Sequence, residues 1–227
     1  METMITTLRW IHILAGMLAL GLAPAAMLTV KGGRAHRTWG KIYVWAMAVV
    51  ASTAVVLALW RPQIFLALLA VFSFYQAFTG YRVLSRKRPD HGPRAIDWAA
   101  ALVTFVASAT LAALGLVRPG ASWQRLGIVP VVFGVLGMVL AGNDIKSFVR
   151  PPAERNAWWF AHMGGMLGSY IAAVSAFSVV NFTFLPTAVR WLWPTAVGTP
   201  LIAIWITYYK IRFRRATTAR IEAASVN

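Results

Sequence analysis

Long apolar stretches alternate along this chain with short basic connectors, and this alternation constrains the fold more than any other feature. A helix needs about 20 consecutive, mostly apolar residues to cross roughly 30 Å of hydrocarbon. Seven stretches approach this length, so the sequence predicts an all-α, polytopic bundle of seven membrane-spanning helices. Pro194 and Pro200 interrupt the last stretch, and residues 182–193 are expected to approach it along the membrane interface. The predicted spans are 11–30, 42–60, 64–83, 98–117, 126–143, 158–177 and 192–209.

The composition excludes several other classes of protein. Hydrophobic residues make up 59% of the chain and charged residues 12%, against about 25% charged in a soluble domain, so the excess apolar surface must face lipid. The 22 Lys and Arg residues against 6 Asp and Glu would suit a nucleic-acid binder, but they form short clusters between apolar runs, not one basic face. No nucleic-acid partner is therefore expected. The absence of cysteine excludes disulfides, thiolate metal sites and cysteine nucleophiles.

The distribution of basic residues predicts how the helices are threaded. Alternate connectors are rich in Lys and Arg, and positive charge accumulates on the cytoplasmic side of a membrane. This rule puts the N-terminus outside and the C-terminus inside, in a multi-pass protein of a cytoplasmic membrane. Residues 1–209 then form one transmembrane domain, and 210–227 form a basic tail expected to contact anionic lipid headgroups. The cytoplasmic segments are 31–41, 82–94, 146–155 and 210–220, and the cations left outside are Arg9, Arg61, Arg118, Arg125 and Arg190.

Small residues mark two predicted spans as closely packed. Gly164 and Gly168 are four residues apart on the sixth span, and Gly134 and Gly137 lie on the fifth. Small residues let helix backbones approach one another in lipid. We expect these faces to contact neighbouring helices, either within the chain or across an interface with a membrane-protein partner or a second copy.

Two histidines are predicted to lie at one membrane depth. His36 begins the second span and His162 lies one turn inside the sixth, both at the cytoplasmic side. Asp144 ends the fifth span at the same level, and Tyr170 lies two turns beyond His162 on its helix. Charged and polar groups are costly at this depth, so the cluster is a candidate site.

The cluster is compatible with several chemistries. His36 and His162 could ligate a b-type haem from both faces, with Arg34 and Arg37 pairing its propionates and Tyr170 nearby. Two histidines and Asp144 could instead hold a divalent ion such as zinc with an open position for water, as in a membrane hydrolase.

Two other interpretations involve no cofactor. In the first, His36 is a solvated histidine and His162 is a hydrogen bonder inside the bundle. In the second, the protein is an accessory or scaffolding subunit of a membrane complex, because no nucleophile motif, phosphate loop or dinucleotide fingerprint is present.

The remaining histidines, His12 and His91, are weaker candidates for a functional site. His12 stands alone near the outer end of the first span and is expected to be a buried hydrogen bonder, although it stays a further candidate. His91 lies in a turn-rich loop between Asp90 and Gly92 and is expected to be solvated.

His12, His36 and His162 each lie within a longer sequence motif. There are three such motifs: Trp10-Ile11-His12-Ile13, the segment from Lys31-Gly32-Gly33 through His36-Arg37 to Gly40-Lys41 and Tyr43, and the segment from Ala161-His162-Met163 to Phe177. In these the chain resembles an uncharacterised family of bacterial multi-helix membrane proteins over almost its whole length. The resemblance implies a bacterial cytoplasmic membrane and draws attention to His12, His36 and His162, but it implies no reaction.

Overall fold

In the computed structural model, described for residues 2–61, 63–88, 91–154 and 156–225, the chain folds into helices joined by short loops, and this part of it contains no strand. The all-α prediction is therefore confirmed. Helices α1 and α8 contain proline, and both continue through it without a break. The elements are α1 (Glu2–Leu28), α2 (Arg34–Trp60), α3 (Ile64–Arg82), the 3-10 turn η1 (Val83–Arg86), α4 (Ala95–Val117), α5 (Ala121–Leu126), α6 (Val129–Val149), α7 (Ala157–Asn181) and α8 (Thr187–Ser225).

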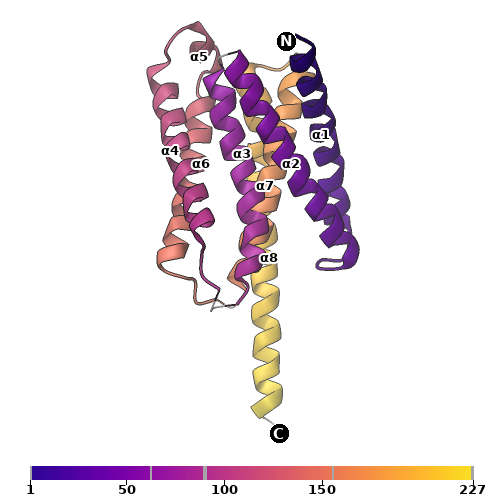
Figure 1. Ribbon diagram of the computed structural model, residues 1–227. Helices are drawn as coiled ribbons and strands as arrows, with labels where there is room; N and C mark the ends of the chain where they lie inside the picture. The colour runs from indigo at the N-terminus through magenta and orange to yellow at the C-terminus, as the bar shows by residue number, and fades with distance from the viewer. Residues whose placement is uncertain (1, 62, 89–90, 155, 226–227) are drawn as a thin grey trace.

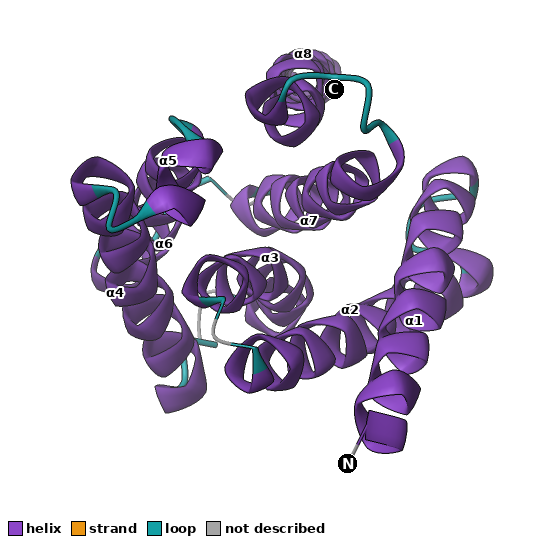
Figure 2. Cartoon of the chain, turned by 90° about the horizontal axis from the view of Figure 1, so that it is seen from above, coloured by secondary structure: helices purple, strands orange, loops and turns teal. Residues whose placement is uncertain are grey.

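The helices α3 and α7 pack against each other in the middle of the bundle. The α1–α2 hairpin lies on one side of this pair and the α4–α6 hairpin on the other, while α8 covers the outer side of α7 (Figure 2). The long helices run up and down in turn, with the N-terminus at one end of the bundle and α8 projecting from the opposite end (Figure 1). This arrangement places the α1–α2, α3–α4 and α6–α7 connections together at the end from which α8 projects.

Six helices of the described chain are long and apolar enough to cross a membrane, namely α1, α2, α3 extended by η1, α4, α6 and α7. The multi-pass membrane prediction is thus confirmed for six of the predicted spans. The segment predicted as the seventh span lies within α8, which is one helix from Thr187 to Ser225. This helix begins within the segment expected to lie along the interface and continues through most of the segment expected to be a separate tail. Residues 226–227 of that tail and Arg155 lie outside the described residues.

The fifth predicted span begins later than expected. Residues Ala121–Leu126 form the short helix α5, and Gly127 then adopts φ 60°, a left-handed conformation that glycine tolerates best. The membrane helix α6 starts at Val129, with proline in its first turn, where the missing N–H costs no hydrogen bond.

The glycines of α6 pack within the chain. A Cβ atom on Gly134 would lie 2.6 Å from the backbone nitrogen of Ala112, and one on Gly137 would lie 2.1 Å from Ser108 Oγ. Only glycine therefore permits the observed approach of α4 and α6. The glycines of the predicted fifth span therefore pack against a neighbouring helix of the same chain.

A buried ion pair joins α3 to the start of α4. Arg82 donates from Nε to Asp97 Oδ1 at 3.0 Å and from Nη2 to Oδ2 at 2.9 Å, and the backbone N–H of Arg94 also donates to Oδ2. The Asp97 side chain is only 2% exposed. A carboxylate at a helix N-terminus also interacts favourably with the helix dipole. The pair therefore fixes the α3–α4 connection at the basic end of the bundle.

Replacing Asp97 with Ala should lower the stability of the protein markedly. Removing one partner of a buried pair leaves the other charge uncompensated, at a cost of about 3–5 kcal/mol, here reduced because Arg82 is partly exposed. Thermal unfolding of the detergent-purified variant should show a clearly lower midpoint, whereas Glu154→Ala, which removes an exposed carboxylate, should leave it unchanged. Equal midpoints for the two variants would contradict this role.

Candidate functional site

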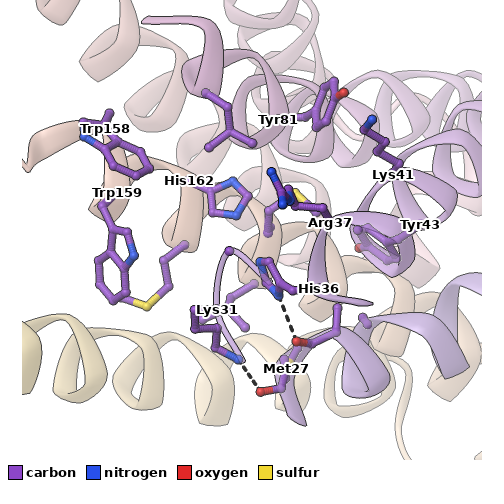
Figure 3. A pocket seen from close by; sticks show the side chains of 18 of the residues that line it. Met27, Lys31, His36, Arg37, Lys41, Tyr43, Tyr81, Trp158, Trp159 and His162 are labelled. Carbon is purple, nitrogen blue, oxygen red and sulfur yellow. Dashed lines mark hydrogen bonds between the residues drawn. The ribbon is translucent and has the colours of Figure 1, made fainter. Parts of the chain in front are cut away.

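The structure brings His36 and His162 together. His36 lies in the first turn of α2 and His162 in the second turn of α7, and their ring centres are 6.2 Å apart with the ring planes at 76°. These are residues 126 positions apart in sequence that the spacing of the spans assigns to one depth. Figure 3 shows both rings at the wall of one cavity.

Each ring is held by the carbonyl of a helix end. His36 Nδ1 donates to Ala26 O at 3.0 Å, and His162 Nδ1 donates to Gly80 O at 2.7 Å. Ala26 and Gly80 lie in the last turns of α1 and α3, where carbonyl groups have no partner within the helix. Because a carbonyl oxygen only accepts, Nδ1 carries the proton in both neutral rings, which leaves Nε2 with a lone pair.

The Nε2 atoms are left available for a ligand. Within the described part of the chain, neither His36 nor His162 uses Nε2 in a hydrogen bond. Anchoring one ring nitrogen on a carbonyl while the other stays available is the arrangement found in metal-ligating histidines. The interpretation of His162 as a hydrogen bonder inside the bundle is thus correct for one nitrogen and leaves the other unexplained.

The two rings border a cavity of about 590 Å³, hereafter the histidine cavity. Helices α1, α2, α7 and α8 line it together with the end of α3 and η1. Aromatic side chains form much of its wall, and methionines line its inner side. The aromatic lining residues are Tyr43, Tyr81, Trp158, Trp159, Trp205 and Tyr209.

The lining is cationic. Five Lys and Arg residues border the histidine cavity, and none of its described lining residues is acidic. Arg82 is already paired with Asp97, and Lys87 Nζ lies 4.6 Å from the ring centre of Trp158. Arg37 and Lys41 make no side-chain hydrogen bond or ion pair within the described residues, so they are the cations most available to an anionic ligand.

Lys31 lines the histidine cavity near His36. Its ammonium group donates to the carbonyl of Met27, at the end of α1 (Figure 3). Partial burial lowers the pKa of Lys31 below its usual value, because desolvation disfavours the charged form.

Three predicted members of the site lie elsewhere. Arg34 is exposed at the first turn of α2 and does not line the cavity. Tyr170 packs against a buried cluster that includes Tyr43 and Met47, beneath the cavity. Asp144 accepts a hydrogen bond of 2.7 Å from Tyr75 Oη, on the side of α3 that faces α6.

The predicted ligand set of His36, His162 and Asp144 is therefore not assembled. Tyr75 and Gly80, which contact Asp144 and His162, are five residues apart on α3, or about 140° around the helix at 100° per residue. Helix α3 thus stands between Asp144 and the histidines although all three share a depth. Among the described residues no group of three His, Cys, Asp or Glu side chains could hold a metal ion.

His12 belongs to the opposite end of the bundle. Its Nδ1 lies 2.9 Å from Thr53 Oγ1 and 3.1 Å from Val50 O, both on α2. This is the hydrogen-bonding role that the sequence predicts for a lone histidine at this depth.

The chain matches no family model, no curated protein and no solved structure. Its resemblance to an uncharacterised bacterial membrane family therefore stays a prediction.

Several residues of the cavity wall are not among the predicted site residues. Lys41 and Tyr43 stand in the same motif as His36, and Trp158 and Trp159 stand one turn before His162, so proximity in the sequence to the two histidines is the signal that could have found them. Trp205 and Tyr209 carried no signal, because only the packing of α8 on α7 brings them to the cavity.

The position of His162 depends on a close contact between α3 and α7. A Cβ atom on Gly165 would lie 2.7 Å from Gly80 Cα and 2.8 Å from Gln76 O. Gly168 lies against the Gln76 side chain, whereas a Cβ on Gly164 would meet nothing within 4 Å. The face of α7 that packs within the chain is therefore formed by Gly165 and Gly168, and Gly164 takes no part in it.

Gly165→Ala should destabilise the protein, while the neighbouring Gly164→Ala should not. The first substitution forces two backbones apart, at a typical overpacking cost of about 1–3 kcal/mol. The second fills open space and replaces glycine within a helix, which stabilises by up to about 1 kcal/mol. Unfolding midpoints in detergent would measure both, and a variant order opposite to this one would contradict the close α3–α7 contact.

Proposed function

We propose that the protein binds a b-type haem in the histidine cavity, where His36 and His162 would hold its iron. One observation carries the proposal: two imidazoles, each anchored through Nδ1 on a carbonyl, have ring centres 6.2 Å apart at the wall of a cationic cavity. An imidazole nitrogen lies roughly 1 Å from its ring centre and a metal–imidazole bond measures about 2 Å, so two rings on opposite sides of one ion have centres about 6 Å apart.

The cavity suits an anionic group with an apolar body. Its volume of about 590 Å³ falls within the range of about 300–1,000 Å³ of typical ligand pockets. Arg37 and Lys41 would pair the carboxylates of the haem, and the aromatic and methionine side chains would contact its ring. Arg34, which lies outside the cavity, has no part in this arrangement.

The ligand set favours electron transfer over the other proposed reactions. A haem held by the two histidines would supply a one-electron redox centre. A hydrolytic zinc site needs three protein ligands in most known cases, and the described residues offer no third one. A divalent ion held by the two histidines and water is the remaining alternative.

The proposed topology places the cavity at the cytoplasmic side of a bacterial cytoplasmic membrane. We propose that α8 is the seventh span, supported by its packing along α7 and by the contact of Tyr209 with Trp159, whose ring centres are 4.8 Å apart. An odd number of spans agrees with termini at opposite ends of the bundle (Figure 1). The cation-rich connections gather at the end that holds the cavity, which supports an external N-terminus and an internal C-terminus.

The projecting part of α8 extends this basic end. We propose that Lys210, Arg212 and Arg215 lie among anionic lipid headgroups, each contributing about 1 kcal/mol to membrane attachment.

The absorbance spectrum and metal content of the detergent-purified protein test the haem proposal. A Soret band with one iron per chain is expected, and His36→Ala or His162→Ala should each abolish or displace it. His12→Ala is the matched control, because His12 also lies in a helix and hydrogen-bonds through Nδ1 but borders a different cavity, so the spectrum should stay unchanged.

The other outcomes are distinguishable. A colourless protein with one divalent metal that both histidine variants lose would replace haem by an ion at the same site. A colourless, metal-free and well-folded protein would overturn the proposal and favour an accessory subunit without its own cofactor.

A further inference from the structure

A second cavity lies at the opposite end of the bundle from the histidine cavity. It has a volume of about 720 Å³ and is lined by residues of α1, α2, α3 and α7, together with Trp191 of α8. We call it the distal cavity. A buried cluster on α1, α2 and α3 separates the two cavities, and the 2.6 Å hydrogen bond between Tyr43 Oη and Ser169 Oγ joins α2 to α7 at this level.

Most polar groups of the distal cavity lie at one end of it. Arg9 lies in the third turn of α1, Arg61 directly follows α2, and Gln63 directly precedes α3. His12 is three residues beyond Arg9, on the same face of α1 and one turn deeper. These residues form a polar rim close to the end of the membrane-spanning helices.

The rim carries positive charge that nothing in the described chain offsets. Arg9 and Arg61 make no side-chain hydrogen bond or ion pair among the described residues, and none of the described lining residues is acidic. His12 Nδ1 is held by Thr53 and Val50, which leaves its Nε2 available. The rim is therefore complementary to an anion.

The deeper wall is apolar. Toward the middle of the bundle the lining consists mainly of aliphatic, aromatic, methionine and small side chains, including Gly16, Leu20, Met47 and Ala173, and the hydroxyl of Ser73 there donates to Leu69 O. A small hydrated anion would lose its water at such a wall without gaining polar partners, whereas an acyl chain would meet surroundings as apolar as the bilayer. The polarity changes along the cavity in the same direction as along a membrane lipid.

We propose that the distal cavity binds one anionic phospholipid from the adjoining leaflet. Its phosphate lies beside Arg9 and Arg61, and one acyl chain extends along the apolar wall past Gly16. The two unpaired arginines favour an anionic lipid, and the apolar depth of the cavity favours an acyl chain inside it. This site is independent of any cofactor in the histidine cavity.

The test uses delipidated full-length protein in a neutral detergent and measures the dissociation constant of dioctanoyl phosphatidylglycerol from the concentration dependence of the unfolding midpoint. Dioctanoyl phosphatidylcholine should bind at least ten-fold more weakly, and inorganic phosphate should not shift the midpoint. The double variant Arg9→Gln, Arg61→Gln should lose about five-fold in affinity for each arginine removed. Arg125→Gln, an exposed arginine at the same end that does not line the cavity, is the control and should bind normally.

A second pair of variants tests whether the chain enters the cavity. Gly16→Leu adds a side chain where a Cβ meets nothing within 4 Å, so the helix should fold while the apolar depth is filled. Gly21→Leu is the matched control, since Gly21 also lies in α1 with open space around it but borders neither cavity. Affinity should fall at least ten-fold for the first variant and stay unchanged for the second.

Three results would overturn the proposal. Equal binding of phosphatidylcholine and phosphatidylglycerol would remove the role of the arginines. Normal binding by Gly16→Leu would place the lipid on the surface and not in the cavity. A midpoint shift of equal size with inorganic phosphate would reduce the site to a simple anion site.

Discussion

The contact between Gly80 of α3 and Gly165 of α7 is the constraint on which the rest of the structure depends. In hydrocarbon there is no water to satisfy a free carbonyl, and helices associate through close packing and internal hydrogen bonds. Where these two glycines meet, the backbones approach closely enough for His162 to reach Gly80 O. The same contact holds α7 in the centre of the bundle, so that α1 and α2 can lie on one side and α8 on the other (Figure 2).

Helix ends explain why the candidate site lies at the membrane surface. The last carbonyls of a helix have no partner within it, and here two of them, at Ala26 and Gly80, accept from histidines of neighbouring helices. The partial negative charge at such ends also favours nearby cations, and the connectors at this end supply several. A cavity with fixed imidazoles and free cations is thus a consequence of where the helices end, and our haem proposal builds on it.

The membrane spans and the common depth of His36 and His162 could be predicted from the sequence, because both depend on the order of apolar and basic segments along the chain. Apolar length sets a span, and alternating basic connectors put His36 and His162 at the same end. Neighbours around each helix could not be predicted in the same way. Lipid-facing and core-facing residues are both apolar in a membrane helix, so hydrophobic periodicity does not identify the inner face.

Asp144 and α8 illustrate this limit. Asp144 shares the depth of the histidines, but it points to Tyr75 on the far side of α3, and depth alone cannot reveal that separation. The prolines of α8 suggested a broken element, whereas the structure has one continuous helix whose Trp205 and Tyr209 reach the histidine cavity. In both cases tertiary packing supplied what local pattern lacked.

The pairing of His36 with His162 is the central claim, and crosslinking tests it most directly. The chain contains no cysteine, so His36→Cys, His162→Cys introduces the only two thiols. In membranes, a short bifunctional thiol reagent should join them within one chain in high yield, while a pair of cysteines at positions 36 and 144 should stay unlinked. Failure of the first pair to crosslink, with both thiols reactive toward monofunctional reagents from opposite sides of the membrane, would contradict the account.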